Sequence, residues 1–358
     1  MIVPNKKLTA SVVVFLVTAG FATFLFTRQG SWERLNGQVD SLYQQGKYAE
    51  ALPLAQEALT LAESSFGFER ANVATSLSNL ALLYRAQGKY MEAEPLYKRA
   101  LILDEKALGA DHPDVVRGLN NLAGLYRVQG KHSEADPLYK RALTIDEKVL
   151  GADHPGVATD LNNLAEMYRA QGKYAEAEPL YKRSLIIWEK ALGPDHPSVA
   201  TSLDNLAMLY GAQGKYAEAE LLSKRSLTIW EKALGPDHPD VATNLNSLAG
   251  LYYIQGKYAQ AEPLSKRALT IWEKAVGPDH PNVATSLDNL AEMYRIQGKY
   301  AQAEPLYRRS LIIWEKALGP DHPDVAASLE NLATLLRKTN RAAEAEEFEG
   351  RARAIRAR

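Results

Sequence analysis

Apolar residues recur along most of this chain with the period of an α-helix. Residues 73–109 contain two such patterns in succession. In the first, apolar side chains recur at spacings of three, four and seven residues and share one helical face: Leu77, Leu80, Ala81 and Tyr84. Gly88 then suits the left-handed end of a helix, and the second apolar stripe runs on to Leu108. This stretch therefore predicts two consecutive helices joined by a tight turn.

The two-helix pattern returns every 42 residues. An Asp-His-Pro triplet marks each return and ends at Pro113, Pro155, Pro197, Pro239, Pro281 and Pro323. Proline suits the first position of a helix, so the triplet predicts where the first helix of a unit begins. We expect one repeat domain over residues 31–358, in which stacked units bury stripes that neither helix buries alone. The units lie near residues 31–72, 73–114, 115–156, 157–198, 199–240, 241–282, 283–324 and 325–358.

The repeats resemble tetratricopeptide repeats. The order of large and small residues in that motif is followed by Leu77, Leu80, Ala81, Tyr84, Gly88, Ala93, Tyr97 and Ala100. Residues 120–143 and 234–242 are also similar to the repeats of kinesin light chains, and the resemblance covers roughly residues 35–350. It implies an all-α, right-handed solenoid of helix pairs whose first helices line a concave groove. The sequence lacks the heptad coiled coil that kinesin light chains also carry, so a motor subunit is not implied.

The N-terminal segment, residues 1–30, has a different pattern. Residues 8–26 carry no charge, and this run of 19 residues is close to the ~20 that span a bilayer. We interpret it as an uncleaved transmembrane anchor; the alternative is a signal peptide cleaved after Ala19, which would export the protein. Lys6 and Lys7 precede the run, so the positive-inside rule favours repeats outside the cytoplasm, in the periplasm if the source is bacterial.

The composition argues against several classes of function. The 42 basic and 43 acidic residues leave a net charge of −1, whereas nucleic-acid-binding proteins usually carry a basic excess. The chain has no cysteine, which excludes disulfides, thiolate catalysis and cysteine-bound metals. It also lacks the motifs of phosphate loops, dinucleotide sites and zinc hydrolases. We predict a non-enzymatic protein with no cofactor and no nucleic-acid partner.

Six Asp-His pairs raise the possibility of a catalytic or metal site. They run from Asp111-His112 to Asp321-His322 and lie one repeat apart. A zinc site or a catalytic site needs side chains that converge on one point. We therefore assign these pairs no catalytic and no metal-binding role. Aspartate instead suits a helix N-terminus, where it caps the helix and opposes its dipole.

A row of asparagines on the first helices is the main candidate for a binding site. On a helical wheel it lies opposite the buried stripe and comprises Asn79, Asn121, Asn163, Asn205, Asn289 and Asn331, with Ser247 in the remaining unit. An amide side chain has two donor hydrogens and an acceptor, and can bind the backbone of an extended peptide whatever its sequence. The resemblance to kinesin light chains implies this use. The alternative is that each asparagine bonds the adjacent helix and holds the stack together.

Charged residues flank this row. Arginines lie beside it in four units: Arg85, Arg127, Arg169 and Arg295. Acidic residues enter in the middle and later units: Glu166, Asp204, Asp288 and Glu292. We expect the acidic part of a ligand to bind near residues 85–169. The alternative is that the arginines are solvated flanks of the helices.

Four tryptophans lie one period apart near the ends of second helices: Trp188, Trp230, Trp272 and Trp314. They fall on the apolar stripe, which predicts packing between neighbouring units. Asp104 and Asp146 occupy the same position in two earlier units, which indicates a position near the surface. A partly exposed aromatic row would then be a second face for protein binding or self-association.

Taken together, these patterns predict a membrane-tethered interaction scaffold that binds an extended peptide or protein segment in its groove. Affinity would come from the asparagines and selectivity from the charged rows. The alternative is a self-associating structural organiser of an envelope complex, which would use the convex or Trp-bearing face.

Overall fold

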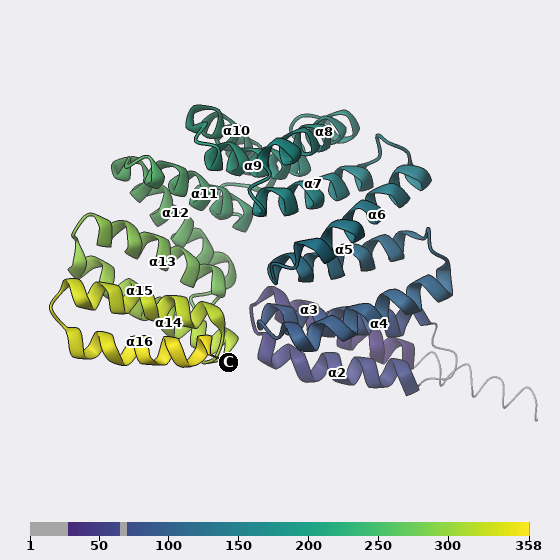
Figure 1. The fold of residues 1–358 in the computed structure, drawn as a ribbon, viewed down its shortest axis with the longest axis horizontal. Helices are drawn as coiled ribbons and strands as arrows, with labels where there is room; N and C mark the ends of the chain where they lie inside the picture. The colour runs from purple at the N-terminus through teal and green to yellow at the C-terminus, as the bar shows by residue number, and fades with distance from the viewer. Residues whose placement is uncertain (1–27, 65–69, 358) are drawn as a thin grey trace, which may run out of the picture.

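The structure is a computed structural model that describes residues 28–64 and 70–357 of the chain. These residues form helices joined by short turns, and they contain no β-strand (Figure 1). The expected all-α solenoid is therefore confirmed. Residues 28–44 form the first helix described, and α2 follows at Tyr48–Ser64.

Further helix pairs follow in regular order. Their first helices are α3 (Arg70–Ala86), α5 (Pro113–Val128), α7 (Pro155–Ala170), α9 (Pro197–Ala212), α11 (Pro239–Ile254), α13 (Pro281–Ile296) and α15 (Pro323–Lys338). Their second helices are α4 (Tyr90–Leu108), α6 (His132–Leu150), α8 (Tyr174–Leu192), α10 (Tyr216–Leu234), α12 (Tyr258–Val276), α14 (Tyr300–Leu318) and α16 (Ala342–Arg356). Proline occupies the first position of α5 and of each later first helix, as the triplet predicted.

A glycine ends the first helix of nearly every pair. Gly88 has a φ of 70°, in the left-handed region that glycine adopts without steric cost. Its N–H donates to the Arg85 carbonyl at 3.0 Å, and the Lys89 N–H donates to the Tyr84 carbonyl at 2.9 Å. These bonds satisfy carbonyl groups that the helix end would leave unpaired. In the last pair Asn340, with a φ of 61°, takes the place of glycine.

Small and large side chains together fill the core within a pair. Ala81 on α3 belongs to one buried cluster with Ala93 and Tyr97 on α4. The alanines let the two helices approach closely, and the tyrosine fills the remaining space. The same cluster continues through Leu119 on α5 and Ala135 on α6. Neighbouring units thus share one continuous core, as a stacked array requires.

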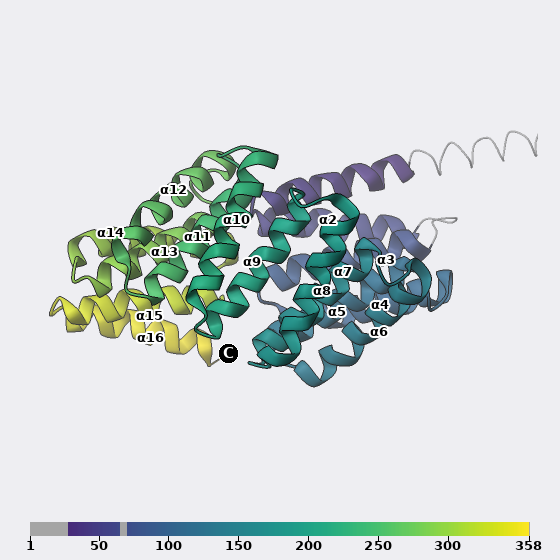
Figure 2. The ribbon, with the colours of Figure 1, turned by 90° about the horizontal axis from the view of Figure 1, so that it is seen from above.

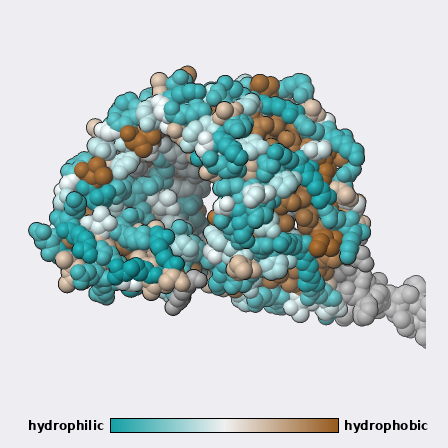
Figure 3. All heavy atoms as spheres, viewed as in Figure 1, coloured by the Kyte–Doolittle hydropathy of each residue, from teal (hydrophilic) through white to brown (hydrophobic). Residues whose placement is uncertain are grey.

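The stack curves, and its first helices lie on the inner side. Successive first helices such as α5, α7 and α9 contact one another. In Figure 1, α5, α7, α9 and α11 border a central hollow, whereas α6, α8 and α10 lie farther out. Figure 2 shows the same winding from above. Figure 3 shows the hollow from the side of Figure 1, between surfaces that are mostly hydrophilic.

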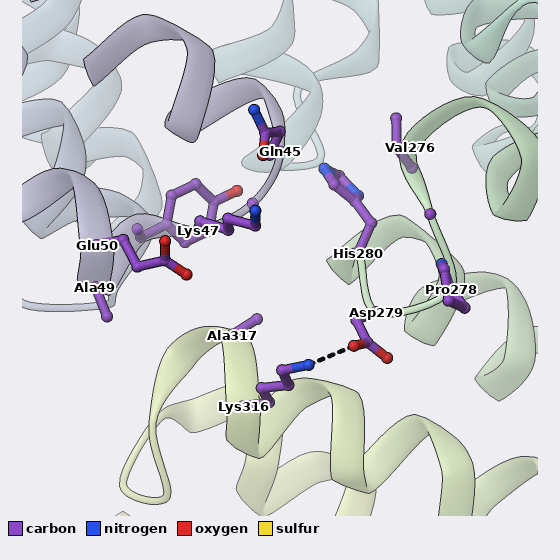
Figure 4. A pocket seen from close by; sticks show the side chains of 13 residues that line it. Gln45, Lys47, Ala49, Glu50, Val276, Pro278, Asp279, His280, Lys316 and Ala317 are labelled. Carbon is purple, nitrogen blue, oxygen red and sulfur yellow. Dashed lines mark hydrogen bonds and ion pairs between the residues drawn. The ribbon is translucent and has the colours of Figure 1, made fainter. Parts of the chain in front are cut away.

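The superhelix winds far enough for its first and later units to meet. The His280 Nε2 atom, just before α13, lies 3.2 Å from the carbonyl oxygen of Gln44, just before α2. A Cβ atom added to Gly46 would lie 2.5 Å from the Cδ atom of Pro281, so only glycine fits there. Figure 4 shows this region, where a pocket of about 330 Å³ separates the two turns beside the contact.

The same contact recurs one unit further along. A Cβ atom added to Gly88 would lie 2.8 Å from the Nε2 atom of His322. His280 and His322 are each 8 % exposed. Their counterparts in earlier units are less buried: His112, His154, His196 and His238. Burial also lowers the pKa of both contacting histidines. The two turns of the superhelix therefore pack directly on each other.

The predicted membrane segment at residues 8–26 lies outside the described residues. Within residues 28–64 and 70–357, no helix is both long enough and apolar enough to cross a membrane. The anchor and the signal peptide both stay predictions.

Candidate ligand-binding groove

The predicted asparagine row splits into two groups. Four of its members are partly exposed, and the other two, Asn289 and Asn331, are exposed. Asn79 Nδ2 donates to Asn36 Oδ1 at 2.8 Å. Asn205 Nδ2 donates to Asn162 Oδ1 at 2.9 Å. At these two positions the asparagine bonds the preceding unit, which is the stack-holding role.

The remaining four asparagines have amides without such a partner. Among the described residues, no side-chain hydrogen bond is formed by Asn121, Asn163, Asn289 or Asn331. Asn121 also lines a pocket of about 140 Å³ between α3 and α5, together with Asn79, Tyr97 and Arg117. These amides can bind a ligand without breaking a bond inside the protein.

A second polar row, which the sequence analysis missed, holds neighbouring units together. It includes residues one position before the asparagine row. Asn120 Nδ2 donates to Asp160 Oδ1 at 2.6 Å, and Asn246 Nδ2 donates to Ser286 Oγ at 2.8 Å. Both bonds cross from one first helix to the next. The same 42-residue period carries this row, so it was visible in the sequence.

The predicted arginines differ in how they are paired. Arg127 contacts Glu166 at 3.2 Å, and Arg295 binds Glu292 through two bonds of 2.6 Å. The hydrogen bonds from Arg295 lower the pKa of Glu292. Arg85 and Arg169 form no ion pair within the described part of the chain, and both are partly exposed. Unneutralised positive charge therefore remains in the early units.

The aspartates predicted beside the groove bond to the protein itself. Asp204 Oδ2 accepts from Trp230 Nε1 at 3.1 Å, and Asp288 Oδ2 accepts from Trp314 Nε1 at 3.0 Å. Burial raises the pKa of both carboxyls to about 6. Both carboxyls are thus bonded inside the stack, and they add little negative charge to the surface of the groove in the later units.

The tryptophan row packs between units, as its position on the apolar stripe predicted. Trp230 and Trp272 are buried, and Trp188 and Trp314 pack against the same core cluster. The expectation that this position lies near the surface was wrong. Asp104 and Asp146 are only 4 % and 6 % exposed. Burial raises the pKa of Asp104 to about 6 and also raises that of Asp146, because a low-dielectric surrounding disfavours the charged carboxylate.

Histidine, rather than aspartate, caps the first helices. His112 Nδ1 accepts from the Asp114 backbone N–H at 3.2 Å, and α5 begins immediately after it. The expectation that Asp111 caps this helix was wrong, because its carboxylate pairs instead with Lys148 of the following second helix. The same pairing recurs at Asp153–Lys190, Asp195–Lys232, Asp237–Lys274 and Asp279–Lys316. Among the described residues no group of three or more acidic or histidine side chains could hold a metal ion.

Comparison with protein families gives repeated matches to one model. The model is described as tetratricopeptide repeat, and it matches residues 35–106, 72–148, 114–185, 161–232, 222–264, 240–311 and 288–358. No match was found among curated proteins.

Several solved structures are similar to this one. The apo form of the quorum sensor NprR from B. thuringiensis has a TM-score of 0.62 and 13 % identity, covering 98 % of this chain and 94 % of that one. A Rap protein complexed with competence and sporulation factor has a TM-score of 0.58 and 16 % identity, covering 92 % and 98 %. A putative kinesin light chain of Podosopora anserina, with nearly identical repeats, is 30 % identical over 57 % of this chain and 97 % of that one, with a TM-score of 0.47.

Proposed function

Because the chain belongs to the tetratricopeptide repeat family, with repeats like those of kinesin light chains, we propose that it is a non-enzymatic interaction scaffold. In this proposal an extended peptide or protein segment lies along the inner face formed by the first helices. The observation that carries it is the set of groove asparagines whose amides have no partner inside the protein, with Asn121 and Asn163 in adjacent units. Amides spaced one unit apart can bond successive stretches of an extended backbone.

The unpaired arginines suggest where an acidic part of the ligand binds. Arg85 lies in the unit before Asn121, and Arg169 lies on the same helix as Asn163. Neither arginine has an acidic partner in the described residues. A carboxylate placed there would gain charge-assisted hydrogen bonds without displacing an internal one. A solved relative of this fold, the Rap protein, is complexed with competence and sporulation factor, and this supports a ligand-binding use of the superhelix.

The test is a peptide selection followed by measured affinities. Random dodecapeptides displayed on phage are selected on the full-length chain, and synthetic copies are titrated by fluorescence anisotropy. We expect Asn121→Ala together with Asn163→Ala to weaken binding by roughly fivefold to a hundredfold, because two backbone contacts worth about 0.5–1.5 kcal/mol each are lost.

A matched variant guards against indirect effects. Thr228→Ala with Thr270→Ala removes two exposed polar side chains from the second helices. This variant should bind as wild type does, and both variants should show unchanged helical circular dichroism and melting. Peptides that bind the two variants equally well would contradict the groove proposal.

We also propose that residues 8–26 anchor the protein in a membrane with the repeats outside the cytoplasm. The alternative is export after cleavage behind Ala19. The apolar run continues past Ala19 to Phe26, which supports the anchor. Alkaline extraction of membranes, with mass spectrometry of the N-terminus, separates the two: an anchored chain stays in the pellet with residues 8–26 intact.

A further inference from the structure

One contact across the floor of the groove is seen in two units. It joins a first-helix residue to the second-helix residue that follows it by 15 positions. Tyr307 Oη donates to Glu292 Oε2 at 2.7 Å in this way. A Cβ atom added to Gly124 would likewise lie 3.6 Å from Tyr139 Oη. The tyrosine therefore fills the floor beneath the first helix.

The residues at these two positions differ between units. From the second unit onwards the pairs are Leu82 with Tyr97, Gly124 with Tyr139, Glu166 with Tyr181, Met208 with Ser223, Gly250 with Ser265, and Glu292 with Tyr307. Each pair contains at least one large side chain, with one exception. Where serine replaces tyrosine at position 223, the first-helix member of the pair is the large residue Met208. At Gly250 and Ser265 both members are small.

A pocket opens at this exception. It has a volume of about 100 Å³ and is lined by Gly250, Ser265, Asn246, Ala249, Tyr253, Asn289, Glu292 and Met293. A Cβ atom added to Gly250 would meet nothing within 4 Å, so the space extends up to the helix backbone. The pocket occupies the place that a tyrosine side chain fills in four other units.

One of the lining side chains has an acceptor atom without a partner. The Asn246 Oδ1 atom is buried and accepts no hydrogen bond, while the Nδ2 atom of the same side chain already donates to Ser286. A buried acceptor without a partner costs free energy, and a ligand donor would remove that cost. Glu292 is already bonded by Arg295 and Tyr307. Ala249 and Met293 give the pocket apolar walls.

We propose that this pocket, which we call the floor pocket, receives a tyrosine side chain of the bound segment. The ring replaces the aromatic side chain that Ser265 lacks, and its hydroxyl donates to Asn246 Oδ1. An apolar cavity of about 150 Å³ takes up a whole benzene ring. The floor pocket is smaller, at about 100 Å³, but it is open towards the groove, so a ring can enter it in part. This inference rests on the groove proposal and adds a side-chain preference to it.

The experiment uses the peptides selected on the full-length chain. Two variants fill the floor pocket with arrangements that the chain itself contains. Ser265→Tyr copies the pair of Gly124 with Tyr139, and Gly250→Met copies the pair of Met208 with Ser223. Thr270→Tyr adds the same aromatic group at an exposed position of α12 and serves as the control. Circular dichroism and melting show that each variant is folded.

We expect the selected peptides to share a tyrosine at one fixed position. Replacing it by alanine should raise the Kd at least tenfold, because burying an aromatic ring contributes roughly that factor or more. Ser265→Tyr and Gly250→Met should each raise the Kd by a similar factor, and Thr270→Tyr should leave it unchanged. Replacing the peptide tyrosine by phenylalanine should cost about threefold to tenfold, since only the bond to Asn246 is lost.

A combined measurement shows whether the tyrosine and the pocket meet. Replacing the peptide tyrosine by alanine and introducing Ser265→Tyr should each lower the affinity. The two losses of binding free energy should not add, because both changes remove the same contact. Peptides that depend on Asn121 and Asn163 but bind both filled variants as tightly as wild type would overturn the floor pocket alone. If no selected peptide depends on those asparagines, the groove proposal fails and the floor pocket fails with it.

Discussion

Several carboxyl groups are buried inside this stack, and Asp160 is the most strongly affected. It is 1 % exposed, accepts from Asn120, and lies next to the carboxyl of Asp146. Burial raises its pKa from 3.8 to about 7. From residue 73 onwards the other units carry an uncharged residue at this position: serine in most, as at Ser202, asparagine at Asn244 and glycine at Gly118. The carboxyl is therefore an exception that one unit tolerates.

This burial predicts a pH dependence of stability. Between about pH 4 and pH 7 the folded state keeps a proton on Asp160 that the unfolded state has lost, so the free energy of unfolding falls as pH rises through this range. Asp160→Asn removes the effect and keeps an acceptor for Asn120. We expect the variant to be more stable than wild type by about 2–4 kcal/mol at pH 8, and by much less at pH 4.

Urea unfolding followed by circular dichroism at pH 4, 6 and 8 measures this difference. Asp40→Asn, which removes an exposed carboxyl from residues 28–44, is the control and should leave the stability difference between pH 4 and pH 8 unchanged. A stability gain for Asp160→Asn that is equal at all three pH values would mean that ionisation of Asp160 is not its cause.

At the scale of single helices, the starts of the first helices depend on histidine. The His196 Nδ1 atom accepts from the Ser198 N–H at 3.2 Å, and Pro197 occupies the first helical position. The N-terminus of a helix leaves backbone donors unpaired, and this bond satisfies one of them. Proline has no N–H to satisfy, so the two residues complement each other.

Removing the cap should weaken the protein modestly. We expect His196→Ala to lower the free energy of unfolding by about 1 kcal/mol, whereas His196→Asn should restore most of it because asparagine is a good capping residue. Urea unfolding measures both. His132→Ala is the comparison, since His132 begins α6 but does not cap it. Equal losses for the two alanine variants would show that the cap contributes nothing particular.

At the scale of the whole molecule, two successive turns of the superhelix contact each other directly. Gly46 lies against Pro281, and Gly88 lies against His322. The same glycine turn occurs in the middle units without a neighbour: Gly172 and Gly214 have φ values of 72° and 75°, and an added Cβ atom would meet nothing within 4 Å. Gly172 and Gly214 therefore provide a control for substitutions at Gly46 and Gly88, where the two turns touch.

Opening the contact should expand the molecule. Gly46→Asn with Gly88→Asn keeps the left-handed backbone, which asparagine tolerates, but places side chains where the two turns meet. We expect a larger radius of gyration by small-angle X-ray scattering than for wild type. Gly172→Asn with Gly214→Asn carries the same backbone cost without the clash and should leave the radius unchanged. Equal radii for the two double variants would show that the contact does not hold the turns together.

The sequence was a reliable guide to features that depend on neighbouring residues. Helical spacing, the left-handed glycine and the proline at a helix start act within a few positions of the chain, so the helix pairs and their 42-residue period follow from sequence. The packing of Trp230 and Trp272 also follows, because they lie on the apolar stripe. The sequence did not show which residue caps the first helices, because His112 and Asp111 are adjacent and the side chain of either can bond the helix start.

The sequence by itself determined the fold, the order of its units and the row of asparagines that faces away from the second helices. The tertiary structure alone decided which of these asparagines are free: Asn79 and Asn205 bond the preceding unit, and Asn121 and Asn163 do not. It also decided where the floor stays open and that His280 meets Gln44 across 236 residues. The physical reason is that these contacts depend on the angle between successive units, and a small angle adds up over the whole array.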